Sequence, residues 1–297
     1  MRRRYREKIY KCGEYLEVDI FPVTDGAKTP ATKRKSRYKP TSAVQARLNQ
    51  RNAERALTRL LNANFTAEDI SVTLTYNSDE LPDTYEQAER DAKNFLRRVK
   101  RLRAKQGLPE LKYVLIPGGG RYHFHIPMSG GVDDKMLQSL WGYGYLNVVH
   151  FELNEHGLEG HARYIAQQFE ADEYDGEDLL SVLDIDEETG EATVRRKGKR
   201  RYSCSRNIER PEPVERDGRI SAARVEELAT VDSANGAAFE AMYPGYVFTG
   251  VRPYYNAEYG GYYLQVLMYK EGLRLKKPRW SRRKGATRNT SADELPW

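Results

Sequence analysis

The most constraining feature of this sequence is the order of strand and helix patterns between residues 70 and 169. Alternation of apolar and polar side chains is typical of a strand, and apolar residues three or four apart are typical of a helix. Strand patterns stand at residues 70–76, 112–116, 121–126 and 145–153, and helical patterns at 91–107, 133–141 and 160–169. This β-α-β-β-α-β-α order predicts an α+β domain, in which helices pack on one face of an antiparallel sheet in the ferredoxin-like, split βαβ arrangement.

Chemistry-bearing side chains gather in the second half of this region, which holds all five histidines of the chain. His123 and His125 alternate with Phe124, so both imidazoles point to one face of their strand and could hold one divalent metal ion. On the helix after Gly160, His161, Tyr164 and Gln168 are spaced i, i+3 and i+7 and therefore share a face. Either motif alone is compatible with simple packing. Their combination favours a site in which a metal polarises a phosphodiester and a tyrosine attacks phosphorus.

At these residues the chain resembles the HUH-endonuclease replication initiators of rolling-circle elements, the replication-associated proteins of bacterial phages, plasmids and integrated elements. The resemblance extends from about Tyr5 to about Tyr269, and several motifs match in both order and spacing. These are ISVTLTY (70–76), KYVLI (112–116), YHFHIPMSGG (122–131), LWGYGYLNV (140–148) and GLEGHARYIAQ (157–167).

The resemblance implies that His123 and His125 bind Mg²⁺ or Mn²⁺ and that Tyr164 is the nucleophile. The family usually supplies a carboxylate as third ligand on the strand that enters the histidine turn, where this chain has Ile116, Pro117 and Gly118. His161 is the favoured replacement, and Gln168 and Glu152 are the alternatives. The family often has a lysine three residues after the tyrosine, and this chain has Gln167 there.

Charge is distributed unevenly, although the net charge of +6 is modest. Basic residues cluster in the first 60 residues, at 195–201 and at 274–284, which favours a nucleic-acid surface over an acidic partner. Predicted DNA contacts fall on the second helix and on the first strand of the central region. They are Arg97, Arg98, Lys100, Arg101, Thr73 and Thr75. A phosphate track on the helix would make DNA binding strongly salt-dependent.

The chain divides into five predicted segments. Residues 1–41 form an N-terminal β-rich arm with a basic connector, 42–169 form the nuclease domain, and 170–194 form an acidic insertion. Residues 195–272 form a C-terminal β-rich extension that includes an aromatic hairpin, and 273–297 form a basic disordered tail. Two cysteines give no disulfide framework or zinc ribbon, and no apolar run approaches membrane length, so we expect a bacterial cytoplasmic protein.

The favoured function is metal-dependent nicking and joining of single-stranded origin DNA through a 5′-phosphotyrosine intermediate, which initiates rolling-circle replication. The chain has no GxxxxGK[ST] motif, so a host helicase and a host polymerase are the expected partners. Two alternatives remain. A related transposase or relaxase would use the same histidines and tyrosine on different DNA, and a non-catalytic origin-binding protein or repressor would retain the fold without the chemistry.

Overall fold

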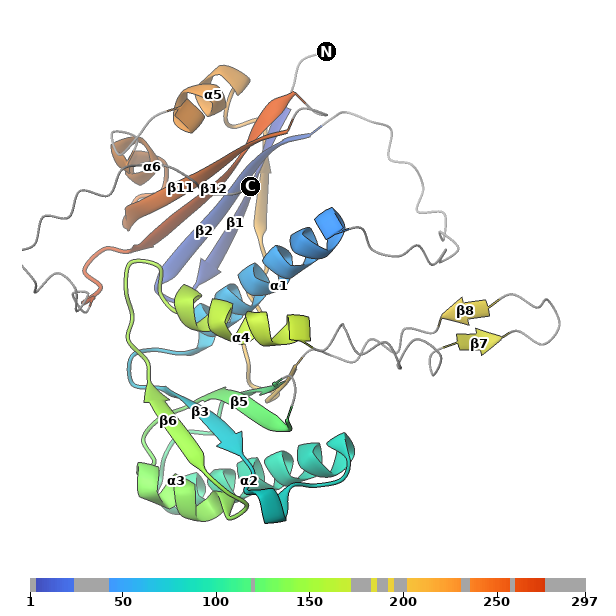
Figure 1. Cartoon of the computed structure of the whole chain (residues 1–297). Coiled ribbons are helices and arrows are strands. Elements are labelled where there is room, and N and C mark those ends of the chain that lie inside the picture. Colours follow the sequence, from blue (N-terminus) through green and yellow to red (C-terminus); the bar gives the residue numbers. More distant parts are fainter. Residues whose placement is uncertain are drawn as a thin grey trace, which may run out of the picture.

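The computed structural model describes residues 4–23, 43–118, 121–171, 183–185, 192–194, 202–230, 236–256 and 260–275. For residues 43–50, 168–171, 183–185, 192–194, 230 and 256, only the backbone is described. These residues form a mixed α+β protein with two five-stranded antiparallel sheets. In Figure 1 the sheets lie one above the other, with two helices between them. No helix in the described part of the chain is long and apolar enough to cross a membrane.

The sheet that contains the two predicted histidine ligands has the strand order β6-β3-β5-β4-β9. Its central strands are β3 (Ile70–Thr75) and β5 (His123–Met128), which pair antiparallel with Thr73 opposite His125. The outer strands are β6 (Leu146–His150), β4 (Val114–Pro117) and the short β9 (Ser203–Cys204). Helix α2 (Tyr85–Lys105) connects β3 to β4, and α3 (Asp134–Trp141) connects β5 to β6. Strand β5 therefore lies between the two strands that α2 connects.

Helices cover this sheet on both faces, whereas the sequence predicted helices on one face only. Helices α2 and α3 pack on the face that carries Val72, Leu74 and Phe124, and the 3-10 turn η1 (Ser78–Glu80) precedes α2. On the opposite face, α1 (Ala43–Asn64) and α4 (Glu159–Ala171) contact Val114 and Ile116 of β4. Both faces of β4 are buried, and such an inner strand shows no alternation from which one covering layer could be predicted.

The second sheet joins the two ends of the chain. Its order is β10-β1-β2-β12-β11, so the predicted N-terminal arm and the predicted C-terminal extension pair with each other. The strands are β1 (Arg4–Cys12), β2 (Tyr15–Val23), β10 (Val214–Asp217), β11 (Tyr246–Asn256) and β12 (Gly261–Lys270). Helices α5 (Ala222–Thr230) and α6 (Gly236–Met242) cover its outer face around Phe239. Strand β9, from the same C-terminal extension, pairs with β4 of the first sheet.

The layer of α1 and α4 connects the two sheets (Figure 1). Its contact with the second sheet is polar, because Arg55 and Arg59 of α1 form ion pairs with Glu17 and Asp19 of β2, both of which are buried. Its contact with the first sheet is apolar and is formed by the cluster around Leu61.

Two predicted segments fall largely outside the described residues. In the acidic insertion, 170–194, the structure describes the end of α4 and the small hairpin of β7 (Leu183–Ile185) and β8 (Ala192–Val194). The hairpin matches the turn pattern of the sequence there. Of the basic tail, 273–297, only residues 273–275 are described, so the expectation of disorder there stays a prediction.

Candidate active site

Strand β5 places His123 and His125 on the same face of the first sheet, as their spacing predicts. Their ring centroids lie 5.0 Å apart with the ring planes nearly perpendicular. Phe124, between them, points to the opposite face and is buried against α2 and α3. The two imidazoles therefore face the layer of α1 and α4.

Hydrogen bonds at the Nδ1 atoms fix how the two imidazoles present their other nitrogen. Nδ1 of His123 lies 2.8 Å from the carbonyl oxygen of Arg121, and that oxygen can only accept, so Nδ1 carries the proton and neutral His123 has its lone pair on Nε2. Nδ1 of His125 lies 3.2 Å from the Oγ1 hydroxyl of Thr73, while its Nε2 is buried without a partner. Ligating histidines are typically oriented in this way, through the ring nitrogen that does not bind the metal.

Burial keeps His125 neutral. The side chain is 3% exposed, and desolvation, reinforced by the nearby imidazoles of His123 and His161, lowers the pKa of His125 to about 4. The imidazole is therefore in its neutral form, the form that binds metals, throughout the physiological pH range.

Helix α4 brings Tyr164 to the histidines. Ala162 and Ile165 are fully buried and attach the helix to the sheet, whereas Tyr164 points away from the core and is 52% exposed. Its ring centroid lies 5.6 Å from that of His125, with an interplanar angle of 82°. The structure thus brings together the three residues His123, His125 and Tyr164 and leaves the tyrosine accessible to a large substrate.

Ion pairs hold the first turn of α4 from three elements. The buried carboxylate of Glu159 accepts hydrogen bonds from Arg163 of the same helix and from Arg252 of β11, each at 2.7 Å. Arg163 also donates to Glu54 of α1. Both sheets therefore contribute to the position of the helix that carries Tyr164.

The predicted third ligands lie differently. His161 is on α4 as expected, but its ring packs against Phe151 at 5.1 Å, and its Nε2 is buried without a partner. Burial lowers its pKa to about 4. In the part of the chain that the structure describes, no three His, Cys, Asp or Glu residues are placed to hold one metal ion. Glu152 is exposed in the segment after β6, and the side chain of Gln168 lies outside the described residues.

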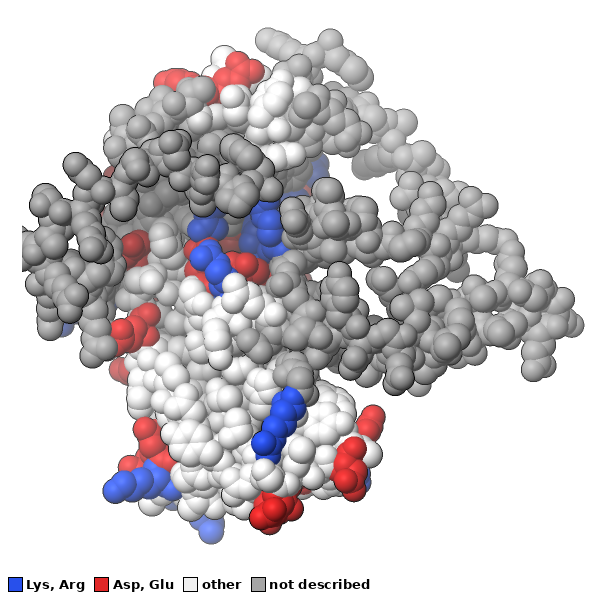
Figure 2. Space-filling view, in the orientation of Figure 1, with Lys and Arg blue, Asp and Glu red and all other residues white. Residues whose placement is uncertain are grey.

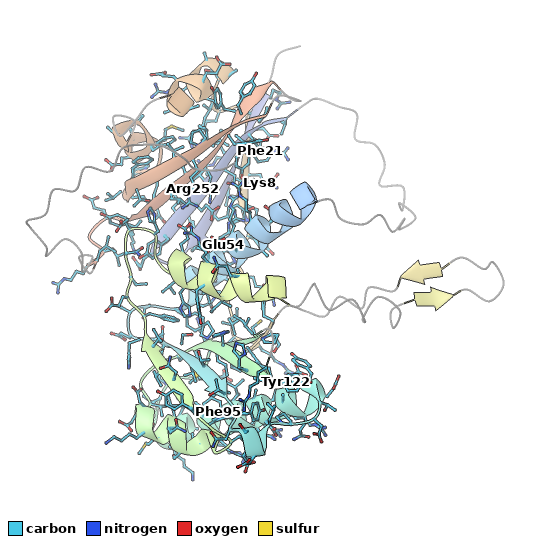
Figure 3. The ribbon with its side chains drawn as sticks, viewed as in Figure 1. Lys8, Phe21, Glu54, Phe95, Tyr122 and Arg252 are labelled. Atoms are coloured by element: carbon cyan, nitrogen blue, oxygen red, sulfur yellow. The ribbon has the colours of Figure 1, made fainter. Side chains whose placement is uncertain are left out.

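The predicted phosphate track lies on the far side of the sheet from the histidines. Arg97, Arg98, Lys100 and Arg101 belong to α2, whose apolar side, with Phe95, packs on the opposite face (Figure 3). Arg98 donates to the carbonyl oxygen of Leu140, and Lys100 pairs with Glu110. Of the two threonines, Thr73 supports His125, and Thr75 donates its hydroxyl proton to the carbonyl oxygen of Tyr145.

Gly118, which sequence reasoning noted only as the place of a missing carboxylate, lies directly against His123. A Cβ atom built on Gly118 would lie 2.0 Å from Nε2 of His123. Any side chain at position 118 would therefore displace the imidazole. The signal was available in the sequence as a glycine next to an expected ligand position.

We expect Gly118→Ala to lower activity at this site about 10- to 100-fold, because the methyl group pushes the His123 ring out of place. The fold should persist, since the ring end of His123 can move. Single-turnover assays and thermal unfolding would measure both effects. Gly160→Ala is the matched control, because a Cβ at Gly160 on α4 meets nothing within 4 Å. An unchanged rate in Gly118→Ala would show that His123 does not need its present position.

The fold and the site define an α+β protein in which two neutral, strand-borne imidazoles meet an exposed helix-borne tyrosine. Residues 69–173 match a family model of replication-associated proteins, the ORF2 type. The matched region is about a third of the chain, begins at β3 and contains His123, His125 and Tyr164. It associates the chain with replication initiation. No curated protein and no solved structure matches the chain significantly.

Proposed function

We propose that this protein nicks and rejoins single-stranded DNA with Tyr164 as nucleophile and thereby initiates rolling-circle replication. The observation that carries the proposal is the convergence of Tyr164 with His123 and His125 inside the region that matches a replication-associated family. The strand order β6-β3-β5-β4, with α2 and α3 as connections, also supports it, because this is the order of the ferredoxin-like arrangement expected of an HUH nuclease core.

Tyr164 would carry the covalent chemistry. Its phenolic oxygen attacks the scissile phosphorus, the bond from phosphorus to the 3′-oxygen breaks, and the departing oxygen takes a proton to become a free 3′-hydroxyl. The phenol loses its proton to solvent, to which the side chain is open. Joining is the reverse reaction, in which a 3′-hydroxyl attacks the phosphotyrosine and releases Tyr164.

The residues present fit a divalent cation held by two imidazoles. His125 has a buried, unpartnered Nε2, and His123 directs its Nε2 lone pair outward because its Nδ1 proton is bound to a carbonyl oxygen. His123 and His125 would hold Mg²⁺ or Mn²⁺, with water and the substrate phosphate as further ligands. When bound, the cation supplies Lewis-acid activation and orientation of the phosphate.

Incubation with single-stranded origin DNA tests this function. We expect a covalent protein–DNA adduct on denaturing gels with Mg²⁺ or Mn²⁺, and its loss with a chelator, because the imidazoles alone cannot neutralise the charge that develops on phosphorus. Restoring the metal should restore the adduct. Binding without an adduct under either metal would contradict the proposal and favour a non-catalytic origin-binding protein. Cleavage only of hairpin transposon ends or of a transfer origin would identify the transposase or relaxase alternative.

A further inference from the structure

A cleft of about 440 Å³ lies between α1 and the second sheet, away from the candidate active site. We call it the aromatic cleft and define it by six of its lining residues, Lys8, Tyr10, Phe21, Arg55, Arg59 and Tyr263. Figure 3 labels Lys8 and Phe21 on the strands beside α1. Figure 2 shows basic and acidic side chains gathered at the level of α1, above a largely uncharged surface.

The cleft presents aromatic faces from three strands. Phe21 of β2 and Tyr263 of β12 stack at 6.1 Å with an interplanar angle of 25°. Tyr10, on β1, has the guanidinium of Arg59 at 3.6 Å over its ring. All three aromatic side chains are half-buried rather than part of the core. Half-exposed rings on neighbouring strands are the surfaces on which unpaired bases stack.

Cations are fixed among these rings. Arg55 and Arg59 are anchored by Glu17 and Asp19, which hold both guanidinium groups at the wall of the cleft. Lys8 lies 5.9 Å from the centre of the Phe21 ring. Its ion pair with Glu215 is partly exposed, and a phosphate can replace such a partner at little cost. Rings that take bases and cations that take phosphates therefore stand side by side.

The aromatic cleft is connected to the tyrosine helix through α1. Arg55 lines the cleft, and the residue before it, Glu54, accepts a hydrogen bond from Arg163, the residue before Tyr164. The cleft and the exposed tyrosine are thus on two sides of the same pair of helices.

We propose that the aromatic cleft is a second binding site for single-stranded DNA, which holds bases next to the segment at Tyr164. The choice of single-stranded DNA as ligand rests on the proposed function, and the stacking faces and fixed cations come from the cleft itself. Phe21 and Tyr263 take the bases, and Lys8 takes a phosphate. The strand therefore remains attached to the protein on both sides of α1 while its end is covalently held.

Fluorescence anisotropy with a labelled twenty-residue oligothymidylate tests the site in the full chain carrying Tyr164→Phe. This homopolymer has no origin sequence, so its binding does not depend on nicking. We expect Phe21→Leu to weaken binding about 5- to 50-fold, because loss of one stacking face removes about 1–3 kcal/mol of binding free energy, which spans this range. Phe21→Tyr, which keeps the ring, should bind within about twofold of the parent.

Tyr255→Leu is the matched control. Tyr255 is an exposed tyrosine on the same hairpin, but it pairs with Tyr262 and so lies on the opposite face from Tyr263. Its replacement should leave the affinity unchanged. Equal affinities of Phe21→Leu and Phe21→Tyr for the oligonucleotide would overturn the proposal. Loss of affinity in Phe21→Leu without any adduct formation by the wild type would retain the cleft and reject the nuclease.

Discussion

Tyr164→Phe is expected to abolish the covalent DNA adduct and to lower the nicking rate by at least about 10³-fold, as removal of a nucleophile does in other enzymes. The substitution removes only a hydroxyl from a side chain that is 52% exposed, and the phenylalanine ring can keep its contact with His125. Stability should therefore stay within about 0.5 kcal/mol of wild type. A denaturing gel with end-labelled DNA, together with thermal unfolding, measures both quantities.

The matched control for this substitution is Tyr145→Phe. Tyr145 is 64% exposed, and the interaction it makes with Thr75 uses its backbone carbonyl, which the substitution retains. The control should form the adduct at the wild-type rate. An adduct in Tyr164→Phe, mapped by mass spectrometry to another tyrosine, would assign the nucleophile elsewhere. Undiminished nicking without any adduct would instead indicate direct attack by water.

Local patterns predicted most elements of the fold, because each depends on neighbours in sequence. Thr84 caps α2 and Asp133 caps α3 through side-chain oxygens, so both helices begin near the positions where the sequence indicates a start. Partner choice is different. Strand β2 pairs with β1 and with β12, more than two hundred residues away, and no local pattern specifies that partner. The arm and the extension were therefore predicted as separate segments.

The site was predictable where it depended on one strand, and less so where it depended on packing. A period of two sufficed for His123 and His125. The same period places Phe124 on the other face, so the apolar side of α2 had to lie opposite the histidines, and its basic residues could not join them. The position of His161 depends on its contact with Phe151, which comes from a segment with no regular spacing relative to α4.

Glu17→Ala is expected to lower the free energy of unfolding by about 3–5 kcal/mol, because it leaves buried arginines without their main partner. Glu17 is 6% exposed and accepts hydrogen bonds from Arg55, Arg59 and Gln265. Urea unfolding at neutral pH measures the loss. Glu215→Ala is the control, since Glu215 forms its ion pairs with Arg6 and Lys8 at the surface, and its removal should have no measurable effect.

The pH dependence of this loss distinguishes a charge effect from a packing effect. Burial alone would raise the pKa of Glu17, but hydrogen bonds and charges from Arg59 and Arg55 outweigh it and hold the pKa below its ordinary value of 4.5. A depressed carboxyl pKa stabilises the fold above pH 4.5, and this stabilisation is lost as the pH falls through the lower folded-state pKa. The difference in unfolding free energy between wild type and Glu17→Gln should therefore shrink as the pH falls below 4.5.

The same variant tests whether the second sheet supports the tyrosine helix. Glu17 anchors α1, and α1 reaches Arg163 of α4 through Glu54. If the sheet positions Tyr164 through this path, Glu17→Gln should slow nicking at a temperature where the variant is still fully folded, and the defect should appear in the rate of adduct formation. A wild-type rate in the folded variant would mean that the apolar contacts of Ala162 and Ile165 with the first sheet are sufficient to place the tyrosine.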